Sequence, residues 1–546
     1  MDKFFARRIS APLLTLAVAT LLATAGNIKF WSTLTAATGG LSPARLPLLA
    51  GVFLILVLFF NACLTLASFR YVAKPVLILL VLTASAASYF IAAYGIVIDR
   101  AMIQNVFETD VHEATELFSW RMVLTVGLLG LLPSILIARV QVRFPQGLRG
   151  LLGRVGIAGG SLLLAGLLLM IFFKSLAPAL REHRELRLLL TPTNTIQALH
   201  GYLRSKWSTP VVVAPLGRDA MKGAAWHGQT RRTVTVIVVG ETARAMNFSL
   251  NGYQRDTNPL LARQPGLINF TKVSSCGTAT AVSVPCVFSA FGHDNYSEAK
   301  ASSQEGLLDV LSHAGFKVLW RDNNSGCKGV CARVAYEDLS QASAGTRFCE
   351  DGECHDERLL EGLPELIRNS KDDLVIVLHQ KGSHGPAYAR RYPQDFGHFG
   401  PACDSNDFEK CSRDSIVAAY DNTILYTDYF LSKTIDLLRH TAAAEGVDTA
   451  MLYFSDHGES LGENNLYLHG APYLFAPAEQ TRVPMMLWMS DRFSERFRID
   501  RNCLTARSTQ PLSHDNVFHS VLGLLDVNTA VLNPRLDLFH ACIRGN

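Results

Sequence analysis

Five long apolar runs dominate the first third of this 546-residue chain and constrain its fold more than any other feature. The runs carry almost no charge, and they lie near the roughly 20 residues that cross a bilayer as a helix. They predict five transmembrane helices, over residues 13–25, 46–69, 75–98, 122–137 and 155–173. A secretory signal peptide would explain the first run alone, with Lys3, Arg7 and Arg8 as its basic flank, so four further runs favour an uncleaved anchor.

The composition agrees with a membrane part. Hydrophobic residues make up 49% of the chain and charged residues 18%, against about 25% in an average soluble protein. This composition argues against a wholly soluble or disordered protein. The formal net charge of +4 leaves no polybasic character for nucleic acid to bind, so no nucleic-acid partner is expected.

Basic residues fix the expected orientation, because loops rich in Lys and Arg stay in the cytoplasm. Such residues precede the first run, join the second to the third, and join the fourth to the fifth. They are Lys3, Arg7, Arg8, Arg70, Lys74, Arg139, Arg143, Arg149 and Arg154. The loop after the third run is acidic instead. With the N-terminus inside and five spans, everything after Lys174 is expected outside.

Cysteine usage points the same way, because ten of the eleven cysteines follow the last run and only Cys63 lies in a span. An even set in an oxidising compartment predicts five disulfides. Spacing suggests, without proving it, the pairs Cys276–Cys286, Cys327–Cys331, Cys349–Cys354, Cys403–Cys411 and Cys503–Cys542. A zinc site built from cysteines is the alternative, but no two C-x-x-C pairs stand at zinc-ribbon spacing.

A Leu- and Arg-rich stretch follows the last run, between Lys174 and Ala224. Its apolar and basic residues alternate at roughly helical spacing around a proline break, which is typical of amphipathic helices on a membrane surface. A solvent-exposed linker is the alternative interpretation.

From Thr233 the pattern changes to short β-branched runs separated by helical segments, at 233–240, 316–320, 374–379 and 449–456. Runs that are apolar on both faces indicate a mostly parallel sheet covered by helices on both sides. In such folds ligands bind outside the carboxyl ends of the strands.

Polar side chains cluster where these runs end. Glu241 follows the first, residues 322–324 follow the second, residues 379–384 follow the third, and Asp456 with His457 follow the fourth. Carboxylate and imidazole groups suit Zn²⁺ or a similar divalent ion. Each residue alone would more often be a helix cap or a surface residue, so the joint placement carries the prediction.

A nucleophile is expected in the segment SSCGTATAVSVPC, at 274–286, which offers hydroxyls in a turn that enters a helix. A Thr at a helix N-terminus faces backbone N–H groups that favour a phosphate and a developing alkoxide. The alternative is that Thr278, Thr280 and Ser283 only cap and pack that helix.

These residues resemble the lipid A phosphoethanolamine transferases, a family that includes the mobile colistin-resistance enzymes. The resemblance extends over nearly the whole chain. Its most specific motifs are VVGETARAMNFSLNGYQRDTNP at 238–259, CGTATAVSVPCVFS at 276–289, WRDNNSGCKGV at 320–330, GSHGPAY at 382–388 and FSDHGESLGENNLYLHG at 454–470.

The resemblance implies an α/β fold, in which a five-helix transmembrane domain is followed by an alkaline-phosphatase-like α/β/α sandwich. The implied domains are a membrane domain at 1–175, amphipathic interfacial helices and a linker at 176–228, and a periplasmic zinc-dependent catalytic domain at 229–546. One Zn²⁺, or two, is implied as the cofactor.

The resemblance also implies the roles of single residues. Zinc is expected on Glu241, Asp456, His457 and the nucleophile Thr280. His384 and His469 match histidines that surround the transferred phosphate or a second zinc, and either one could act as the acid or the base. Residues that match the donor pocket are Asn324, Ser325 and Lys328, with Asn105, Thr109 and Glu113 in the acidic loop.

The implied reaction has two halves. Phosphoethanolamine passes from phosphatidylethanolamine to Thr280, releasing diacylglycerol, and then to a phosphate of lipid A. The product is expected to confer resistance to polymyxins and other cationic peptides. A monomer in the bacterial inner membrane is expected, with the N-terminus in the cytoplasm and the catalytic domain in the periplasm.

Three alternatives stay open at this stage. A phosphoglycerol transferase acting on lipoteichoic acid or periplasmic glucans would share five spans, a Thr nucleophile and similar ligands. A sulfatase would carry a C-x-P-x-R type motif, whereas Val287 and Phe288 follow Cys286. A non-catalytic membrane scaffold would need none of the matched positions, all of which are present.

Overall fold

The computed structural model describes residues 8–38, 40–108, 111–145, 147–183, 186, 188–206, 212–341, 346–350 and 353–544. Lys3 and Arg7 lie outside these residues. The chain forms two compact units, which are described separately. The first comprises the chain up to Ile103 together with Phe118–Arg204, and the second comprises Gln104–Leu117 together with Ser205 onward.

The first unit contains five helical segments long and apolar enough to cross a membrane, Ala11–Ala37, Leu46–Leu66, Ala73–Tyr94, Trp120–Arg139 and Gly147–Phe173. The five predicted spans are therefore confirmed as helices. The first segment is built from α2 (Ala11–Ala23), the short turn η1 (Ala25–Asn27) and α3 (Ile28–Ala37). The second and third are α4 (Leu46–Leu66) and α5 (Ala73–Tyr94).

The fourth span is not one regular helix. It runs from α8 (Trp120–Thr125) through the π-helical turn η2 (Val126–Leu131) into α9 (Leu132–Arg139). The fifth belongs to α10 (Gly147–Glu182), which continues through Pro178 beyond the apolar run. A further helix, α11 (Thr193–Lys206), begins directly after Pro192.

A polar cluster lies inside the helix bundle, where α2, α4 and α10 meet. Asn61 Oδ1 accepts a hydrogen bond from Thr15 at 3.0 Å, and Asn61 Nδ2 donates to Ser161 at 3.3 Å. Thr15 also lies 3.1 Å from the hydroxyl of Thr65. Hydrogen bonds of this kind join helices in surroundings where no water can satisfy the polar groups.

The second unit is built around an eight-stranded sheet with the order β15-β5-β14-β11-β4-β10-β6-β7. Every neighbouring pair is parallel except those made by β14 (Arg482–Met489), which is antiparallel to both neighbours. The prediction of a mostly parallel sheet is confirmed. The other strands are β4 (Thr233–Gly240), β5 (Ile268–Ser274), β6 (Lys317–Asp322), β7 (Ala335–Asp338), β10 (Leu374–His379), β11 (Asp448–Ser455) and β15 (Leu512–Ser513).

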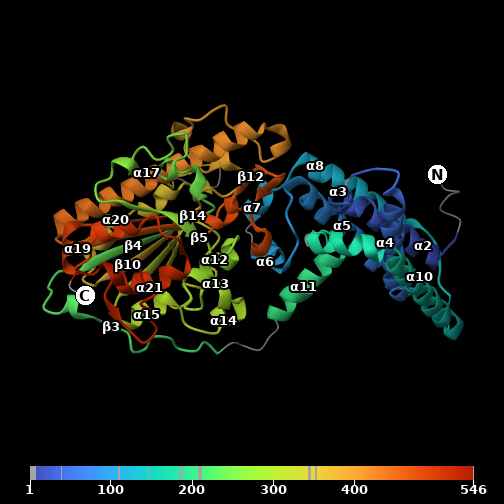
Figure 1. Cartoon of the computed structure of the whole chain (residues 1–546), viewed down its shortest axis with the longest axis horizontal. Coiled ribbons are helices and arrows are strands. Elements are labelled where there is room, and N and C mark those ends of the chain that lie inside the picture. Colours follow the sequence, from blue (N-terminus) through green and yellow to red (C-terminus); the bar gives the residue numbers. More distant parts are fainter. Residues whose placement is uncertain are drawn as a thin grey trace. The chain divides into compact units, whose positions relative to one another are not determined.

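Helices cover both faces of this sheet, as Figure 1 shows. The long helix α17 (Arg413–Glu445) packs along one face. Apolar side chains of α12 (Thr280–Val287), α15 (Leu307–His313) and α21 (Asp515–Leu524) join the strands in one hydrophobic core on the other. Strand β4 is buried along its whole length, which explains its continuous run of β-branched residues.

Five disulfides lie in this unit, and they join the same cysteines that spacing suggests: Cys276–Cys286, Cys327–Cys331, Cys349–Cys354, Cys403–Cys411 and Cys503–Cys542. Cys63, on α4, is free. The Cys276–Cys286 bridge ties the loop before α12 to a residue of that helix, and so encloses Thr280.

Candidate metal centre and nucleophile

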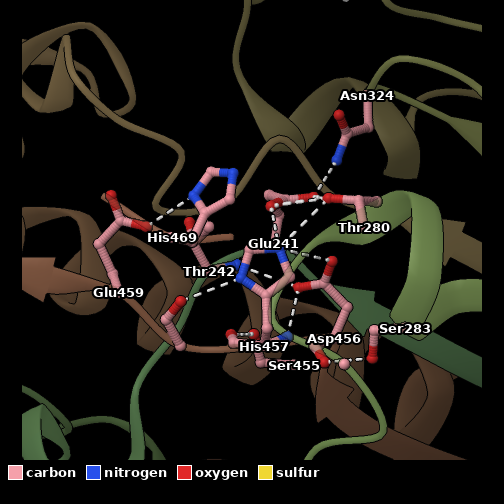
Figure 2. Close-up of polar contacts among 12 residues, drawn as sticks. Glu241, Thr242, Thr280, Ser283, Asn324, Ser455, Asp456, His457, Glu459 and His469 are labelled. Atoms are coloured by element: carbon pink, nitrogen blue, oxygen red, sulfur yellow. Dashed lines mark hydrogen bonds and ion pairs between the residues drawn. The ribbon is translucent and has the colours of Figure 1, made fainter. Parts of the chain in front are cut away.

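Three possible metal ligands meet at the carboxyl ends of two neighbouring strands. Gly240, the last residue of β4, pairs with Ser455, the last residue of β11, so Glu241 and Asp456 emerge side by side. One ligand atom from each of Glu241, Asp456 and His457 lies within 4.8 Å of the other two. All three residues are fully buried. Figure 2 shows the three side chains converging on one point.

Thr280 faces the same point. It is the first residue of α12, as the sequence predicts, and its Oγ1 lies 3.0 Å from Glu241 Oε2 and 3.3 Å from His457 Nε2. The other two candidate hydroxyls do pack the helix: Thr278 donates to the carbonyl of Ala471 and Ser283 to that of Asp456. Of the three hydroxyls, that of Thr280 is the one that faces the carboxylate and imidazole cluster.

The loop after β10 packs directly against the backbone of Glu241. Gly382, just after β10, has a φ of +56°, and a Cβ there would lie 2.6 Å from the carbonyl oxygen of Glu241. Only glycine allows both the left-handed backbone and this approach. Ser383 N–H donates to the same carbonyl at 3.0 Å, which fixes the loop against the end of β4.

The buried charges define what the cluster can hold. Burial, together with the nearby Asp456 carboxylate, raises the pKa of Glu241 to about 7. Burial also raises the pKa of Asp456 to about 7. Both carboxyls would gain from a cation, since a nearby positive charge stabilises their ionised forms.

His457 is prepared as a neutral ligand. Burial lowers its pKa well below the usual range, and its Nδ1 lies 2.9 Å from the carbonyl of Gly458. With the proton on Nδ1, the lone pair of Nε2 faces the carboxylates. Asp456 Oδ1 accepts hydrogen bonds from backbone N–H groups, whereas its buried Oδ2 accepts none from the described residues. Two carboxylates, an imidazole and a hydroxyl are a donor set that fits Zn²⁺.

A small cavity opens above this cluster. It brings together seven of the residues predicted for the nucleophile and substrate site, and it also includes Glu108 and Ala281. The seven are Asn105, Thr280, Asn324, Ser325, Lys328, His384 and His469. A larger cavity of about 560 Å³ shares Glu108, Ala281, Ser325 and Lys328 with it. Thr109 lies outside the described residues, and the side chain of Glu113 is likewise not described.

Two of these residues make contacts that the sequence did not suggest. Asn324, expected only in the donor pocket, also donates from Nδ2 to Glu241 Oε2 at 2.7 Å and so orients that carboxylate. Lys328 Nζ donates to the carbonyl and hydroxyl of Ser325, at 3.0 and 2.9 Å.

Glu459 is a residue beside the site that sequence reasoning missed. Its Oε2 lies 2.9 Å from Nδ1 of His469, and its Oε1 accepts a hydrogen bond from Tyr388. Burial lowers the pKa of His469, but the charge and hydrogen bond of Glu459 outweigh it and raise the pKa to about 9. The sequence did offer one indication of this residue, because Glu459 lies only two positions after the predicted metal ligand His457.

This architecture is matched by known families. A family model described as sulfatase matches residues 233–527, which contain all eight strands of the central sheet. A second model, described as phosphoethanolamine transferase EptA/EptB, matches residues 56–207. The sheet domain thus has the fold of the sulfatases, and the chain belongs to the EptA/EptB family of phosphoethanolamine transferases.

Individual relatives support this assignment. Phosphoethanolamine transferase EptA of Escherichia coli K12 is 42% identical over 486 residues, covering 89% of this chain and 88% of that protein. Phosphatidylethanolamine transferase Mcr-1 of Escherichia coli is 38% identical over 550 residues, covering 97% of this chain and 98% of that protein. The solved structure of lipooligosaccharide phosphoethanolamine transferase A from Neisseria meningitidis is 34% identical, with a TM-score of 0.94 and coverage of 98% and 100%.

Proposed function

We propose that this protein transfers phosphoethanolamine from phosphatidylethanolamine to a phosphate of lipid A through a phosphoethanolamine-threonine intermediate on Thr280. The observation that carries the proposal is the position of Thr280 Oγ1, which faces Glu241 and His457 at the rim of a cavity. The names of the relatives support the chemistry. Mcr-1 is described as a phosphatidylethanolamine transferase, and a relative 28% identical over 446 residues as a Kdo(2)-lipid A phosphoethanolamine 7''-transferase.

The site residues fit a Zn²⁺ ion held by Glu241, Asp456, His457 and Thr280. When bound, this ion would supply Lewis-acid stabilisation of negative charge on the threonine and phosphoryl oxygens. Glu241 Oε2, 3.0 Å from Thr280 Oγ1, lies where it can accept the hydroxyl proton. Asn324 holds that carboxylate in place from the other side.

The first half-reaction forms a bond between Thr280 Oγ1 and the phosphorus of the donor and breaks the bond to the diacylglycerol oxygen, which takes up a proton. The second half forms a bond from the phosphorus to a lipid A phosphate oxygen and breaks the bond to Thr280 Oγ1, which takes up the proton that the acceptor oxygen loses. Lys328 adds positive charge to the cavity, and His384 and His469 line it as groups that can move protons. The added amine offsets a negative charge on the product, which weakens its attraction for polymyxins and other cationic peptides.

The proposed setting is the bacterial inner membrane, with the N-terminus in the cytoplasm, the second unit in the periplasm and the protein acting as a monomer. Five disulfides, all in the second unit, support an oxidising compartment for it. Protease added to intact spheroplasts should cleave loops of the second unit but spare an N-terminal tag. Multi-angle light scattering in detergent should give the mass of one chain, and a dimer mass would contradict the monomer.

The direct test is intact mass of the full-length protein in nanodiscs that contain phosphatidylethanolamine, with peptide mapping. We expect a phosphoethanolamine adduct on Thr280 that is absent from Thr280→Ala and from chelator-treated protein. An adduct formed from phosphatidylglycerol instead would identify a phosphoglycerol transferase. A wild-type protein without any adduct, and a Thr280→Ala strain with unchanged polymyxin sensitivity, would identify a scaffold.

A further inference from the structure

Arg391 is a buried cation outside the Thr280 cavity, and its side chain is only 1% exposed. It follows the short turn η9 (Tyr388–Arg390) and forms ion pairs with two carboxylates, Glu116 and Glu353. Its Nε donates a third hydrogen bond, to the carbonyl of His384 at 2.7 Å. A guanidinium with several fixed partners of this kind holds separate chain segments in one geometry.

The partners of Arg391 come from distant parts of the sequence. Glu116 lies on α7 (Val111–Glu116), within Gln104–Leu117, the segment that belongs to the same compact unit as the sheet domain. Asn406 donates a further hydrogen bond to the backbone carbonyl of Glu116. Glu353 begins β9 (Glu353–Cys354), whose hairpin is closed by the Cys349–Cys354 disulfide.

The other end of Gln104–Leu117 reaches the nucleophile. Asn105 and Glu108, on α6 (Arg100–Glu108), line the same cavity as Thr280 and His384. Arg391 thus bonds to the backbone of His384, which lines that cavity, and to Glu116 on α7, which does not line it.

The two carboxyl groups that contact Arg391 differ in pKa. Burial raises the pKa of Glu116 to about 7, whereas the Arg391 charge outweighs the effect of burial and lowers the pKa of Glu353 to about 2. Lys381 also faces Glu353, and His355 carries a charge interaction with it. One guanidinium thus needs one ionised carboxylate, and the second carboxyl can remain as a hydrogen-bonding partner.

We propose that Arg391 is a positioning residue for the transfer reaction, which fastens Glu116 of α7 beside His384 and so holds His384 in place in the wall of the donor cavity. The expected effect on donor KM rests on the proposed function. The contact of Arg391 with Glu116 and His384 is a property of the fold, and its effect on hydrogen exchange can be measured without activity.

The test compares full-length wild type with Arg391→Met, which keeps much of the side-chain volume but removes the charge, and with Arg391→Lys. The matched control is Arg390→Ala, because Arg390 is an exposed neighbour. Hydrogen exchange by mass spectrometry follows peptides from 104–117 and 380–392, and transfer kinetics are measured at varied mole fraction of phosphatidylethanolamine in vesicles.

For Arg391→Met we expect faster exchange in 104–117 and a donor KM raised about tenfold, with kcat within about threefold of wild type. Arg391→Lys should recover part of the KM, since it keeps the charge without the planar fork. A merely destabilised enzyme would lose active protein, and so kcat, without a change in KM. Wild-type exchange in 104–117, or a KM no higher than that of Arg390→Ala, would overturn the proposal.

A second set of variants covers the case in which Arg391→Met does not fold. Glu116→Gln and Glu353→Gln each leave one carboxylate for Arg391, so each should raise KM less than about threefold. The double variant should raise KM by more than the product of the two single fold-changes. A rise in KM equal to that product would overturn the proposal. If wild type shows no transfer but its hydrogen exchange still differs from that of the Arg391 variants, the proposed function is wrong, whereas the structural role of Arg391 is supported.

Discussion

The side-chain amide of Asn324 donates a hydrogen bond to Glu241 Oε2 at 2.7 Å, the same oxygen that faces the Thr280 hydroxyl. The carboxylate is therefore oriented by a residue from a different strand end. Groups that orient a metal ligand typically contribute about 10- to 100-fold to metal affinity or activity.

We expect Asn324→Ala to bind Zn²⁺ about 10- to 100-fold more weakly than wild type and to lose transfer in proportion. Metal titration followed by mass spectrometry of bound zinc measures the first effect, and adduct formation the second. Asn502→Ala, at an exposed position, should match wild type. Equal zinc affinity in Asn324→Ala and wild type would contradict the role assigned to this amide.

Metal removal should lower both activity and stability. A ligand present at 100 times its Kd stabilises the folded state by about 2.7 kcal/mol, so chelation should lower the Tm of wild type. Asp456→Asn removes one ligand charge, and its Tm should be nearly insensitive to chelator. Differential scanning fluorimetry with and without added Zn²⁺ makes the comparison. A chelator-independent Tm in wild type would show that no ion is held at this site.

The buried carboxyl of Asp537 should make stability depend on pH. Burial raises its pKa from 3.8 to about 7. The protonated form is favoured by folding, so its contribution is complete below pH 3.8 and is lost as pH rises to about 7. Asp537→Asn keeps the oxygen that accepts from Phe539 N–H. In denaturant unfolding, its advantage over wild type in free energy of unfolding should therefore grow from pH 5 to pH 8, reaching about 1–3 kcal/mol. Asp491→Asn, at an exposed side chain, should show no such trend.

The polar cluster at Asn61 should stabilise the helix bundle. Interhelical hydrogen bonds in membranes contribute about 0.6–2 kcal/mol, and Asn61→Ala removes the bonds to both Thr15 and Ser161. Unfolding in mixed detergent should show a loss of this order. Thr83→Ala is the control, because that hydroxyl is exposed and bonds only within its own helix, to Leu79. Equal losses in the two variants would contradict an interhelical role.

Removing either of two disulfides should lower stability, but only one of the two removals should also lower kcat. Removing Cys276–Cys286, with a separation of 10, should cost about 3 kcal/mol, and removing Cys503–Cys542, with a separation of 39, about 4 kcal/mol. Only the first encloses Thr280, so the Cys276→Ala/Cys286→Ala variant should also lose kcat. Thermal unfolding and adduct kinetics separate the effects. Full kcat in that variant would show that α12 holds Thr280 unaided.

Much of this site could be predicted because parallel strands bring their carboxyl ends to one edge. Glu241 and Asp456 follow apolar runs that the structure confirms as β4 and β11, and their adjacency needs only the strand order. The five spans were predictable from length and hydropathy alone. The π-helical turn in the fourth span was not, because its residues are as apolar as those of a regular helix.

The contacts of Arg391 could not be predicted from the sequence. The hydrogen bond from Arg391 to Glu116 joins residues 275 positions apart, and an ion pair at that separation leaves no local periodicity. The second role of Asn324 was missed for a related reason. A residue type indicates which bonds a side chain can make, whereas packing decides which of them it does make.

The hydrogen bond from Thr242 N–H to Asp456 Oδ1 spans 214 positions. A chain made from its N-terminus therefore exposes Glu241 long before Asp456 and His457 have been synthesised. No early folding intermediate can offer the complete set of ligands, because β4 and β11 must pair first. Binding free energy from a cation is consequently added only to the finished sheet. Metal binding at this site would therefore be a late step in the biogenesis of the enzyme, and a chain cut short before β11 would lack both the ion and its stabilisation.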